Sequence, residues 1–386
     1  MTGSIAAFKA AGWVHSLVKE EARVSVIMTW SATRFVSELT FSALSGNRVY
    51  RDMFAEDPEQ AMAHITLAQE ADIVLIAPAT AHTIARLAHG LADDLLSTAV
   101  LAASGKPVII CPAMNSNMYL HKATQDNLCR LKDLGYITVE PDSGRLACGD
   151  EGPGRLPEWD GVREVLLGCM SRHDLEGQHV LITAGPTREP LDPVRYLSNR
   201  SSGKMGYALA RTARRRGAKV TLVSGPVFLD PPDGVTVISV TTAGEMYKEV
   251  MRLRDKASII VKAAAVADFR PDQYESHKIK KQTAPSSIDL VQNDDILAEL
   301  GRSRKTGQIL VGFAAESRNL EEEGKRKLRD KNADLVVVND ITGTDSGFDA
   351  DTNQVTLISK DGSSSLPHMS KEKTADCIWD HVLSLL

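Results

Sequence analysis

The chain has 386 residues, enough for two or three domains at roughly 150 residues each. With 43% apolar and 25% charged residues, its composition excludes a disordered or fibrous chain. A formal net charge of -5 provides no overall field for binding nucleic acid, and no apolar run reaches the roughly 18 residues of a membrane span. Its five cysteines lack the spacing of a zinc site or a disulfide framework. We therefore expect a reduced, cytoplasmic protein that binds neither nucleic acid nor membrane.

Short β-branched runs alternate with amphipathic stretches through the first part of the chain. We predict strands over residues 23–28, 72–77 and 106–111, and helices over residues 79–89 and 94–103. This alternation is typical of βαβ units, in which helices cover both faces of a parallel sheet.

A polar stretch over residues 171–178 interrupts this pattern, and we place a domain boundary there, between residues 1–172 and 173–386. After it the alternation resumes, and a run over residues 353–358 predicts part of a hairpin. The predicted strands of the second part cover residues 179–183, 219–223, 235–240, 257–263, 308–314 and 334–338. Its predicted helices cover residues 205–215, 243–254, 320–331 and 371–385. The sequence therefore predicts two α/β domains.

The chain begins with a Gly3-Ser4-Ile5 turn that leads into a helical pattern. Backbone amides and the helix dipole at such a turn favour an anion such as a phosphate. A strand normally precedes a phosphate turn of this kind, and the sequence shows none before Gly3. We interpret this as a truncated or misassigned start, which would weaken the binding of a phosphate-bearing cofactor.

A glycine-rich segment over residues 144–155 carries Cys148 together with Arg145 and Arg155. Its composition predicts a loop, and a cysteine in such a loop is not a core residue. Nearby positive charge makes a thiol easier to ionise. We therefore predict a flap that closes over an anionic substrate; the alternative is a surface loop with an incidental thiol.

Motifs in both parts of the chain resemble known enzymes. Those of the first part resemble flavin-dependent cysteine decarboxylases and are His64-Ile65, Ala77-Pro78-Ala79-Thr80-Ala81, Asp93-Asp94-Leu95-Leu96-Ser97-Thr98, Pro112-Ala113-Met114-Asn115 and the segment around Cys148. Those of the second part resemble phosphopantothenate–cysteine ligases and are Thr183-Ala184-Gly185-Pro186-Thr187, Asp192-Pro193-Val194-Arg195, Asn199-Arg200-Ser201-Ser202-Gly203-Lys204-Met205-Gly206, Ala264-Ala265-Val266-Ala267-Asp268 and Lys278-Ile279-Lys280-Lys281. Because they occur together and in order, the chain resembles the bifunctional phosphopantothenoylcysteine decarboxylases and phosphopantothenate–cysteine ligases of bacterial coenzyme A synthesis. The resemblance implies two Rossmann-like α/β domains, an N-terminal flavodoxin-like flavoprotein domain and a C-terminal doubly wound ligase domain.

For the first domain, the resemblance implies that FMN supplies the electron sink needed to remove CO2 from phosphopantothenoylcysteine. Cys148 would donate a proton in the last reduction, His64 would be the acid/base group, and Asn115 would hold the substrate carboxylate. For His64 the alternative is a surface histidine at the start of a helix. The residues expected to bind FMN are Gly3, Ser4, Ile5, Thr29, Pro78, Ala79, Thr80, Ser97 and Thr98.

For the second domain, the resemblance implies that CTP activates the carboxylate of phosphopantothenate, after which cysteine displaces CMP. Lys278 would close over the phosphates, and Asn199 would bind the acyl cytidylate. Asp268, expected at the end of a strand, would hold the nucleotide or its Mg2+ ion. The residues expected to bind CTP are Asp268, Lys278, Asp294, Asp295, Ile296, Leu297, Phe313, Lys327 and Lys331. The alternative for the lysine cluster at Lys278 is a solvated surface patch.

Two common nucleotide-binding motifs are absent from the sequence. A P-loop is excluded because Ser198 and Met205 stand where glycine and Ser or Thr are required, and no Gly-x-Gly-x-x-Gly motif indicates a dehydrogenase. Gln292 and Asp294 replace a lysine and a proline that are common in the family, which would weaken nucleotide binding. The alternative functions are a ligase with an impaired flavin domain and a non-catalytic flavoprotein subunit. The resemblance also implies a homo-oligomer with trimeric flavin domains and dimeric ligase domains, possibly combined in a dodecamer.

Overall fold

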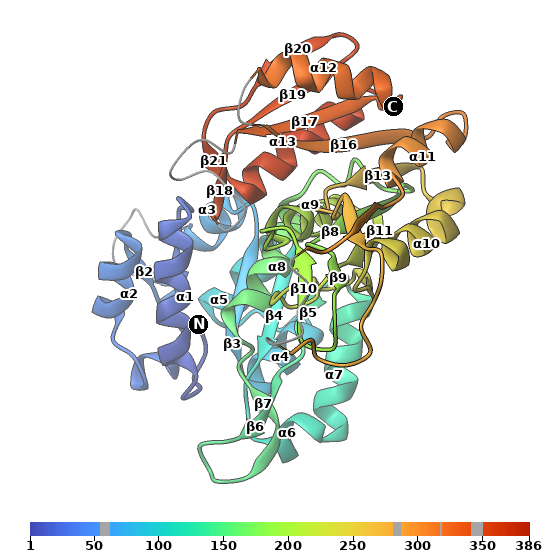
Figure 1. Ribbon diagram of the computed structural model, residues 1–386. Helices are drawn as coiled ribbons and strands as arrows, with labels where there is room; N and C mark the ends of the chain where they lie inside the picture. The colour runs from blue at the N-terminus through green and yellow to red at the C-terminus, as the bar shows by residue number, and fades with distance from the viewer. Residues whose placement is uncertain (55–61, 281–286, 317–318, 341–349) are drawn as a thin grey trace. The chain divides into compact units, whose positions relative to one another are not determined.

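The computed structural model describes residues 1–54, 62–280, 287–316, 319–340 and 350–386. The chain forms two compact units, Met1–Met170 and Ser171–Leu386, and each is considered by itself (Figure 1). Within the described ranges, no helix is both long and apolar enough to cross a membrane.

Unit 1 is built on a parallel sheet of three strands, in the order β3-β4-β5. The strands are β3 (Val74–Ala79), β4 (Val108–Pro112) and β5 (Ile137–Thr138). Buried side chains of α4, α5 and α7 form one hydrophobic core with this sheet, and those of α1 and α8 form another. These helices are α1 (Ala7–Lys19), α4 (Ala81–Ala88), α5 (Leu95–Ala102), α7 (Lys122–Asp133) and α8 (Trp159–Met170). The predicted helix-covered parallel sheet is confirmed.

The first residues lie between two groups of strands. β1 (Val26–Ile27) pairs in parallel with β2 (Val49–Tyr50), and this pair packs against α1 and α2 (Glu38–Ser45). The Met1 amino group donates to the carbonyl of Ile27 at 2.9 Å. On the other side, the Thr2 hydroxyl donates to the carbonyl of Pro78 at 2.7 Å. The Gly3-Ser4-Ile5 turn is therefore fixed at the ends of β1 and β3.

The segment that carries Cys148 is a hairpin, not the loop that its composition predicts. β6 (Asp142–Arg145) pairs in antiparallel fashion with β7 (Glu151–Arg155), and Cys148 lies in the connection between them. Glycine lets β7 approach the chain that follows β4, because an ideal Cβ on Gly154 would lie 2.2 Å from the carbonyl oxygen of Met114. The same glycines that indicate a loop by composition allow β7 to lie directly on the backbone that follows β4.

Unit 2 contains an eight-stranded sheet in the order β12-β11-β8-β13-β16-β17-β19-β20. The first six of these strands are parallel, and β19 and β20 close the sheet as an antiparallel hairpin. The strands are β8 (His179–Ala184), β11 (Lys219–Ser224), β12 (Thr236–Ser239), β13 (Ile259–Lys262), β16 (Ile309–Glu316), β17 (Leu335–Asp340), β19 (Val355–Ser359) and β20 (Gly362–Ser365). Two hydrophobic cores cover the sheet, one with α9 and α13 and the other with α10, α11 and α12 (Figure 1). The helices are α9 (Lys204–Arg215), α10 (Ala243–Leu253), α11 (Ile296–Ser303), α12 (Leu320–Asp330) and α13 (Lys371–Leu383).

The direction of strand addition reverses between β8 and β13. From β8 the chain proceeds outward to β11 and β12, and it then returns to the other side of β8 to form β13, β16 and β17. In doubly wound sheets, ligands bind at the carboxyl ends of the strands at such a reversal. The predicted doubly wound α/β fold is confirmed, and its topology places a candidate ligand site at the ends of β8 and β13.

The structure corrects the expectation that Asp268 ends a strand. β13 ends at Lys262, six positions earlier in the sequence. Beyond it, side chains take over the hydrogen bonds of the sheet: the amide of Ala264 donates to the Thr183 hydroxyl at 3.2 Å, and the amide of Ala267 donates to the Thr187 hydroxyl at 3.0 Å. The chain therefore leaves the sheet at Lys262, and Asp268 lies in an exposed connection.

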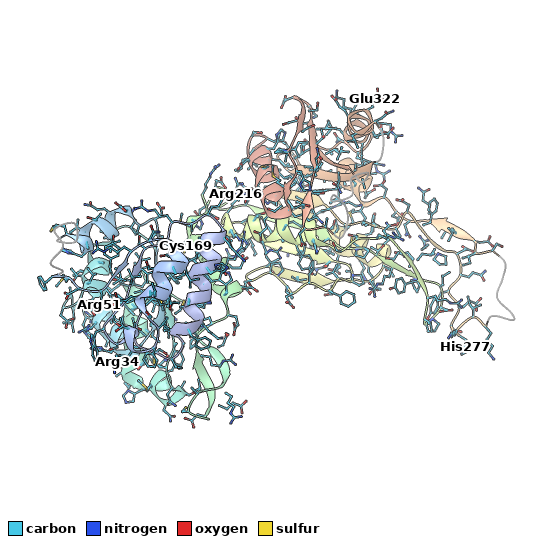
Figure 2. All side chains as sticks on the ribbon, turned by 90° about the vertical axis from the view of Figure 1, so that its left-hand side faces the viewer. Arg34, Arg51, Cys169, Arg216, His277 and Glu322 are labelled. Carbon is cyan, nitrogen blue, oxygen red and sulfur yellow. The ribbon has the colours of Figure 1, made fainter. Side chains whose placement is uncertain are left out.

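Two short antiparallel pairs form an extension of unit 2. β9 pairs with β10, and β14 pairs with β15. Their bounds are β9 (Arg188–Pro190), β10 (Tyr196–Ser198), β14 (Phe269–Pro271) and β15 (Leu290–Gln292). Figure 2 shows His277, which precedes the predicted catalytic Lys278, at the outer end of the extension. A further pair links β18 (Thr352–Asn353) to β21 (Met369–Ser370).

Candidate functional sites

A cavity of about 740 Å³ opens in unit 1 around the Gly3 turn. Of the residues predicted to bind FMN, Gly3, Thr29 and Thr80 line it. Its other lining residues are Thr2, Met28, Trp30, Ser31, Arg51, Asp52, Ala81, His82, Thr83, Arg86, Asp94, Leu95, Leu96 and Met118. Ala81, Asp94, Leu95 and Leu96 belong to the motifs described above but were not predicted to bind FMN, whereas the exposed Trp30 and Arg51 come from connections without a recognisable motif.

Local contacts shape the wall of this cavity. An ideal Cβ on Gly3 would lie 2.4 Å from Cβ of Ser31, so only glycine fits at this point of the turn. The amide of Thr80 donates to the Thr2 hydroxyl at 3.0 Å, which joins the Gly3 turn to the start of α4. Opposite charges are paired at the rim, where Arg86 lies 2.5 Å from Asp94 and 2.6 Å from Asp93.

The remaining residues predicted for FMN lie outside the cavity lining. Ser97 is 2% exposed and forms a capping box with Asp94 at the start of α5, and the Thr98 hydroxyl donates to the carbonyl of Asp94 at 2.7 Å. Ala79 is fully buried, and the carbonyl of Pro78 accepts a hydrogen bond from Thr2. Ser4 and Ile5 continue the turn, and Ile5 points to solvent with 58% exposure. These residues shape the turns around the cavity.

The cavity suits a group of the size and chemistry of FMN. Its volume lies within the roughly 300–1,000 Å³ that is usual for cofactor pockets. The Gly3 turn precedes α1, so it presents backbone amides at a helix start, where a phosphate is favoured. The lining combines the indole of Trp30 with hydroxyl groups of Thr29 and Thr80, a mixture that suits an aromatic ring carrying polar edges.

A second group of residues in unit 1 brings two predicted catalytic side chains together. Asn115 caps α6 (Ser116–Leu120), and its Nδ2 lies 3.2 Å from Sγ of Cys148. The same Nδ2 lies 2.9 Å from Oδ2 of Asp150, and Sγ of Cys148 lies 3.4 Å from that oxygen. Asp150 was not predicted; its position two residues after Cys148 in a hairpin connection was the available signal.

His64 lies on α3 (Ala63–Glu70), as predicted, and is half-buried. Its Nδ1 is buried and has no hydrogen-bond partner among the described residues. A buried ring nitrogen without a partner is unusual and is consistent with a site that a ligand completes. Within the described part of the chain, no hydrogen bond joins His64 to Asn115 or Cys148.

In unit 2, Lys262 lies at the reversal point of the sheet. It pairs in register with Thr183 of β8 on one side and Gly312 of β16 on the other. Its Nζ donates to the carbonyl of Ala264 at 3.1 Å. Burial and the positive charge of Lys327 lower the pKa of Lys262 from 10.5 to about 8, although Asp295 and Asp268 oppose this shift.

Lys262 was not among the predicted site residues, yet it interacts electrostatically with four residues predicted to bind the nucleotide: Asp268, Asp295, Lys327 and Lys331. A lysine at the end of a buried apolar strand was the available signal. A half-buried ammonium beside other lysines is costly without an anion. This electrostatic cluster is therefore a candidate anion site at the sheet edge where the topology predicts a ligand.

Asp295 connects α11 to α12. Its Oδ1 accepts the amide of Ala298 at 2.8 Å as the cap of α11, and its Oδ2 lies 2.8 Å from Nζ of Lys331. Burial disfavours the charge of Asp295, but the hydrogen bond from Lys331 lowers its pKa below the ordinary value. The side chains of Ile296 and Leu297 are 2% and 3% exposed and belong to the core, so only their backbone is available to a ligand.

Phe313 and Asp294 have surroundings of their own. Phe313 is half-buried and packs against the core that contains α9 and α13, whereas α11 and α12 belong to the other core. Asp294 lines a separate cavity of about 420 Å³ beside the β9 and β14 strands. The other lining residues of that cavity are Glu189, Pro190, Thr242, Ala243, Gly244, Arg270, Pro271, Asp272, Tyr274 and Asn293.

Asn199 and Asp268 lie around the connection that follows β13. Nδ2 of Asn199 donates to the carbonyls of Ala265 and Val266 at 3.2 and 3.1 Å. The Asp268 carbonyl accepts the amide of Asn293 at 2.8 Å, while its carboxylate is exposed. No three His, Cys, Asp or Glu side chains gather as a metal site in the described ranges. A magnesium ion at Asp268 would therefore depend on phosphate oxygens for other ligands, as is usual for nucleotide-bound Mg2+.

Lys278 is exposed in the extension, but the residue after it is anchored. Arg195 donates to Oδ2 of Asp192 at 2.6 Å and to the carbonyl of Ile279 at 2.9 Å. The amide of Ile279 donates to the same Asp192 oxygen at 3.2 Å. The hydrogen bond from Arg195 holds the pKa of the buried Asp192 well below its ordinary value. The expected loop at Lys278 is therefore tethered immediately beside the lysine.

Comparison with known proteins matches each unit to a protein family. The family model for the flavoprotein domain matches residues 1–171, and that for the DNA/pantothenate metabolism flavoprotein C-terminal domain matches residues 175–386. The chain is 48% identical over 376 residues to the coenzyme A biosynthesis bifunctional protein CoaBC of Bacillus subtilis, covering 96% of this chain and 92% of the relative.

Other relatives extend the comparison. The CoaBC protein of Vibrio cholerae is 45% identical over 383 residues, covering 98% of this chain and 95% of the relative. A crystal structure of the C-terminal domain of a CoaBC protein is 42% identical, covers 55% of this chain and 97% of that chain, and has a TM-score of 0.48. On the extent and identity of the sequence matches, this chain belongs to the family of bifunctional coenzyme A biosynthesis proteins CoaBC.

Proposed function

We propose that the chain joins 4'-phosphopantothenate to cysteine with CTP in unit 2 and decarboxylates the resulting phosphopantothenoylcysteine with FMN in unit 1. The observation that carries this proposal is the pairing of the Asn115 and Cys148 side chains at 3.2 Å in the unit that matches the flavoprotein family. A carboxylate-binding amide beside a proton-donating thiol is the pair that the decarboxylase half requires.

In unit 1, bound FMN would supply the oxidation and reduction that make loss of CO2 feasible. The Gly3 turn would hold its phosphate, with Thr29 and Thr80 at the cavity wall. Asn115 would bind the substrate carboxylate through a neutral amide, which avoids the strong ion pair that would stabilise the ground state. Cys148 would supply a proton from its thiol, and His64 would act as the acid/base group.

In unit 2, the lysines at the sheet edge would receive the nucleotide. Lys327 and Lys331, together with Lys262, provide positive charge near Asp268 and Asp295. Lys278 would approach the phosphates from the extension, and Asn199 would hold the acyl cytidylate near the connection that it already fixes. Mg2+ would accompany the triphosphate at Asp268.

The closing test is a coupled assay. The purified protein is incubated with phosphopantothenate, cysteine, CTP and Mg2+, and the products are identified by mass. We expect phosphopantothenoylcysteine followed by phosphopantetheine, together with a visible flavin spectrum of the protein. Accumulation of the first product alone would support a ligase with an impaired flavin domain, and a flavin spectrum without either product would support a non-catalytic flavoprotein.

Two variants separate the halves. Cys148→Ser should retain ligation and stall reoxidation of the flavin, because the proton donor is lost. Lys278→Gln should block ligation and leave decarboxylation of supplied phosphopantothenoylcysteine intact. Normal formation of phosphopantetheine by Cys148→Ser would refute the role of the thiol, and loss of both activities in Lys278→Gln would refute independent sites.

We also propose that the chain assembles as a homo-oligomer and acts in the cytoplasm on small-molecule substrates. Large apolar side chains are exposed on both units, including Trp30 and Leu39 at 70% and 76% and Phe228 at 101%. Exposed apolar surface of this kind is common at subunit interfaces. Light scattering of the purified protein tests this, and a monomer at all concentrations would refute it.

A further inference from the structure

The carboxylate of Asp150 lies against both side chains that are proposed to act on the substrate of unit 1. Its Oδ2 is 2.9 Å from Nδ2 of Asn115 and 3.4 Å from Sγ of Cys148. Cys148 and Asp150 are exposed and Asn115 is half-buried, so a substrate can reach these side chains from solvent. Neither the sequence motifs nor the proposed mechanism gives Asp150 a task.

The direction of the Asn115 amide is fixed by the backbone. Its Oδ1 accepts the amide of Asn117 at 2.8 Å as the cap of α6. An amide oxygen that is held by a backbone N–H leaves the NH2 group on the opposite side. The NH2 group of Asn115 therefore faces the hairpin, where its Nδ2 lies within hydrogen-bond distance of both Cys148 and Asp150.

The hairpin is held in this position by close packing of β7. The amide of Met114 donates to the carbonyl of Gly154 at 3.0 Å, and no side chain would fit at Gly154. In the connection, the amide of Leu146 donates to the carbonyl of Asp150 at 2.8 Å, and the amide of Gly149 donates to that of Leu146 at 2.9 Å. These bonds fix the turn that carries Cys148 and Asp150, so the contact with Asn115 belongs to a built site.

The NH2 group of Asn115 would then have to serve two carboxylates, that of Asp150 and that of the substrate. If Asn115 binds the carboxylate of the substrate, as the proposed function requires, Asp150 must first release the same amide. Two carboxylates that share one neutral donor repel each other, and the charged hydrogen bond of Asp150 must be broken. Asp150 therefore competes with the substrate, while it holds the thiol and the amide in mutual alignment before the substrate arrives.

We propose that Asp150 is a positioning residue of the decarboxylase site: its carboxylate aligns Asn115 with Cys148 in the substrate-free protein and is displaced from Asn115 by the carboxylate of the substrate. This inference rests on the proposed function of unit 1. It predicts that Asp150 weakens substrate binding, because its carboxylate competes with that of the substrate for Asn115. It also predicts that Asp150 favours the subsequent proton transfer, because it aligns the thiol of Cys148.

The first test measures the contact without activity. Cys148 is alkylated with neutral iodoacetamide and with anionic iodoacetate, and the modified peptide is quantified by mass. A carboxylate near Sγ repels the anionic reagent, and the ratio of the two rates cancels any change in thiol ionisation. We expect Asp150→Asn to lower the ratio of iodoacetamide to iodoacetate rates about threefold, the effect of one exposed charge at this distance.

Matched controls make this test specific. Glu151→Gln removes a neighbouring exposed charge from β7 and should leave the ratio unchanged. The exposed Cys129 on α7 provides a reference thiol in every sample. An unchanged ratio in Asp150→Asn, or an equal change in Glu151→Gln, would overturn the inference whether or not the protein decarboxylates.

The second test is kinetic and uses supplied phosphopantothenoylcysteine. Asp150→Ala should lower KM about threefold, because the competitor is removed, and should lower kcat about tenfold, because the thiol loses its alignment. Asp150→Asn, which keeps an acceptor oxygen, should restore part of kcat. A higher KM with unchanged kcat would show that Asp150 binds substrate and would overturn the inference. If the wild-type protein has no decarboxylase activity, the proposed function fails. The alkylation ratio still shows whether the Asp150 carboxylate lies beside the Cys148 thiol.

Discussion

Asp295 and Lys331 form an ion pair of 2.8 Å that joins α11 to the end of α12. Both residues are expected to bind CTP, so each is held by the other when no nucleotide is present. Asp295 has a second task, since its other oxygen caps α11 through the amide of Ala298. The two tasks can be separated because asparagine is as good a helix cap as aspartate.

Replacement of Asp295 should distinguish the cap from the ion pair. Asp295→Ala loses both, whereas Asp295→Asn loses the charge and retains the cap. We expect the alanine variant to be less stable than the asparagine variant by about 1 kcal/mol, the usual value of a cap. Urea denaturation followed by circular dichroism measures this difference. Equal stability of the two variants would show that the cap contributes nothing.

Lys262 should make the stability of unit 2 depend on pH. Its pKa is about 8 in the folded protein and 10.5 in the ordinary state, so between these values the unfolded chain binds a proton that the folded chain does not. Stability should therefore rise with pH through this window. Lys262→Met should remove the rise and be more stable than the wild type near neutral pH. Urea midpoints at about pH 7 and about pH 9.5 test both statements; parallel curves for the two proteins would contradict them.

Lys262 should also link nucleotide binding to proton uptake. An anion near its ammonium favours the protonated form and raises the pKa, so CTP should bind with uptake of a proton near pH 8 and more weakly at higher pH. Calorimetry in two buffers with different ionisation heats measures the proton count. Lys262→Met should weaken CTP binding and abolish the uptake. Cytidine, which lacks phosphates, is the control ligand: an equal loss of cytidine binding would place Lys262 at the base or ribose.

Gly154 should be essential for the position of the Cys148 hairpin. Its φ of +138° is unfavourable for other residues, and a Cβ would lie 2.2 Å from the Met114 oxygen. Gly154→Ala should push β7 away from Asn115 and reduce decarboxylation at least tenfold. Gly149→Ala is the matched control, since Gly149 also has a positive φ of +93° but an open environment. Similar losses in both variants would attribute the effect to backbone strain alone.

Asp192 should control the anchoring of the Lys278 segment. Asp192→Asn weakens the bonds to Arg195 and Ile279, so ligation should slow while decarboxylation is retained. Because the pKa of Asp192 is lowered in the folded protein, its stabilisation is present above the unfolded pKa and is lost as the pH falls through the folded value. The free energies of unfolding of the wild type and the variant should therefore differ most above the unfolded pKa and converge as the pH falls, which acid denaturation measures. Normal ligation by the variant would show that ligation does not depend on the anchoring of Ile279 by Asp192 and Arg195.

The sequence predicts the strands of unit 2 well because they are buried on both faces. β8, β11 and β17 read as short runs rich in apolar and β-branched residues between helical stretches, and the structure places them in one sheet. Unit 1 is less regular: the strand expected over residues 23–28 pairs only at Val26–Ile27. The ends of strands are hard to predict, because side-chain bonds such as those of Thr183 and Thr187 decide where the chain leaves the sheet.

The candidate sites were only partly predictable for a different reason. Motifs identified Asn115 and Cys148, whose contact the structure shows. Asp150 and Lys262 were not predicted because an acidic residue in a turn and a lysine at the end of a strand are common without any chemical role. Their importance depends on neighbours that are far away in the sequence, such as Asn115 for Asp150 and Lys327 for Lys262.

The packing of α13 against α9 on the sheet of unit 2 bears on how the chain folds during synthesis. Trp379 of this helix is fully buried and donates to the hydroxyl of Thr212 on α9. A ribosome synthesises the N-terminal part first, and domains fold as units. Unit 1 can therefore fold during translation. In nascent unit 2, the apolar side of α9 stays uncovered until α13, which packs on it, has been synthesised. Chaperones that recognise exposed apolar segments would meet the growing chain in that interval.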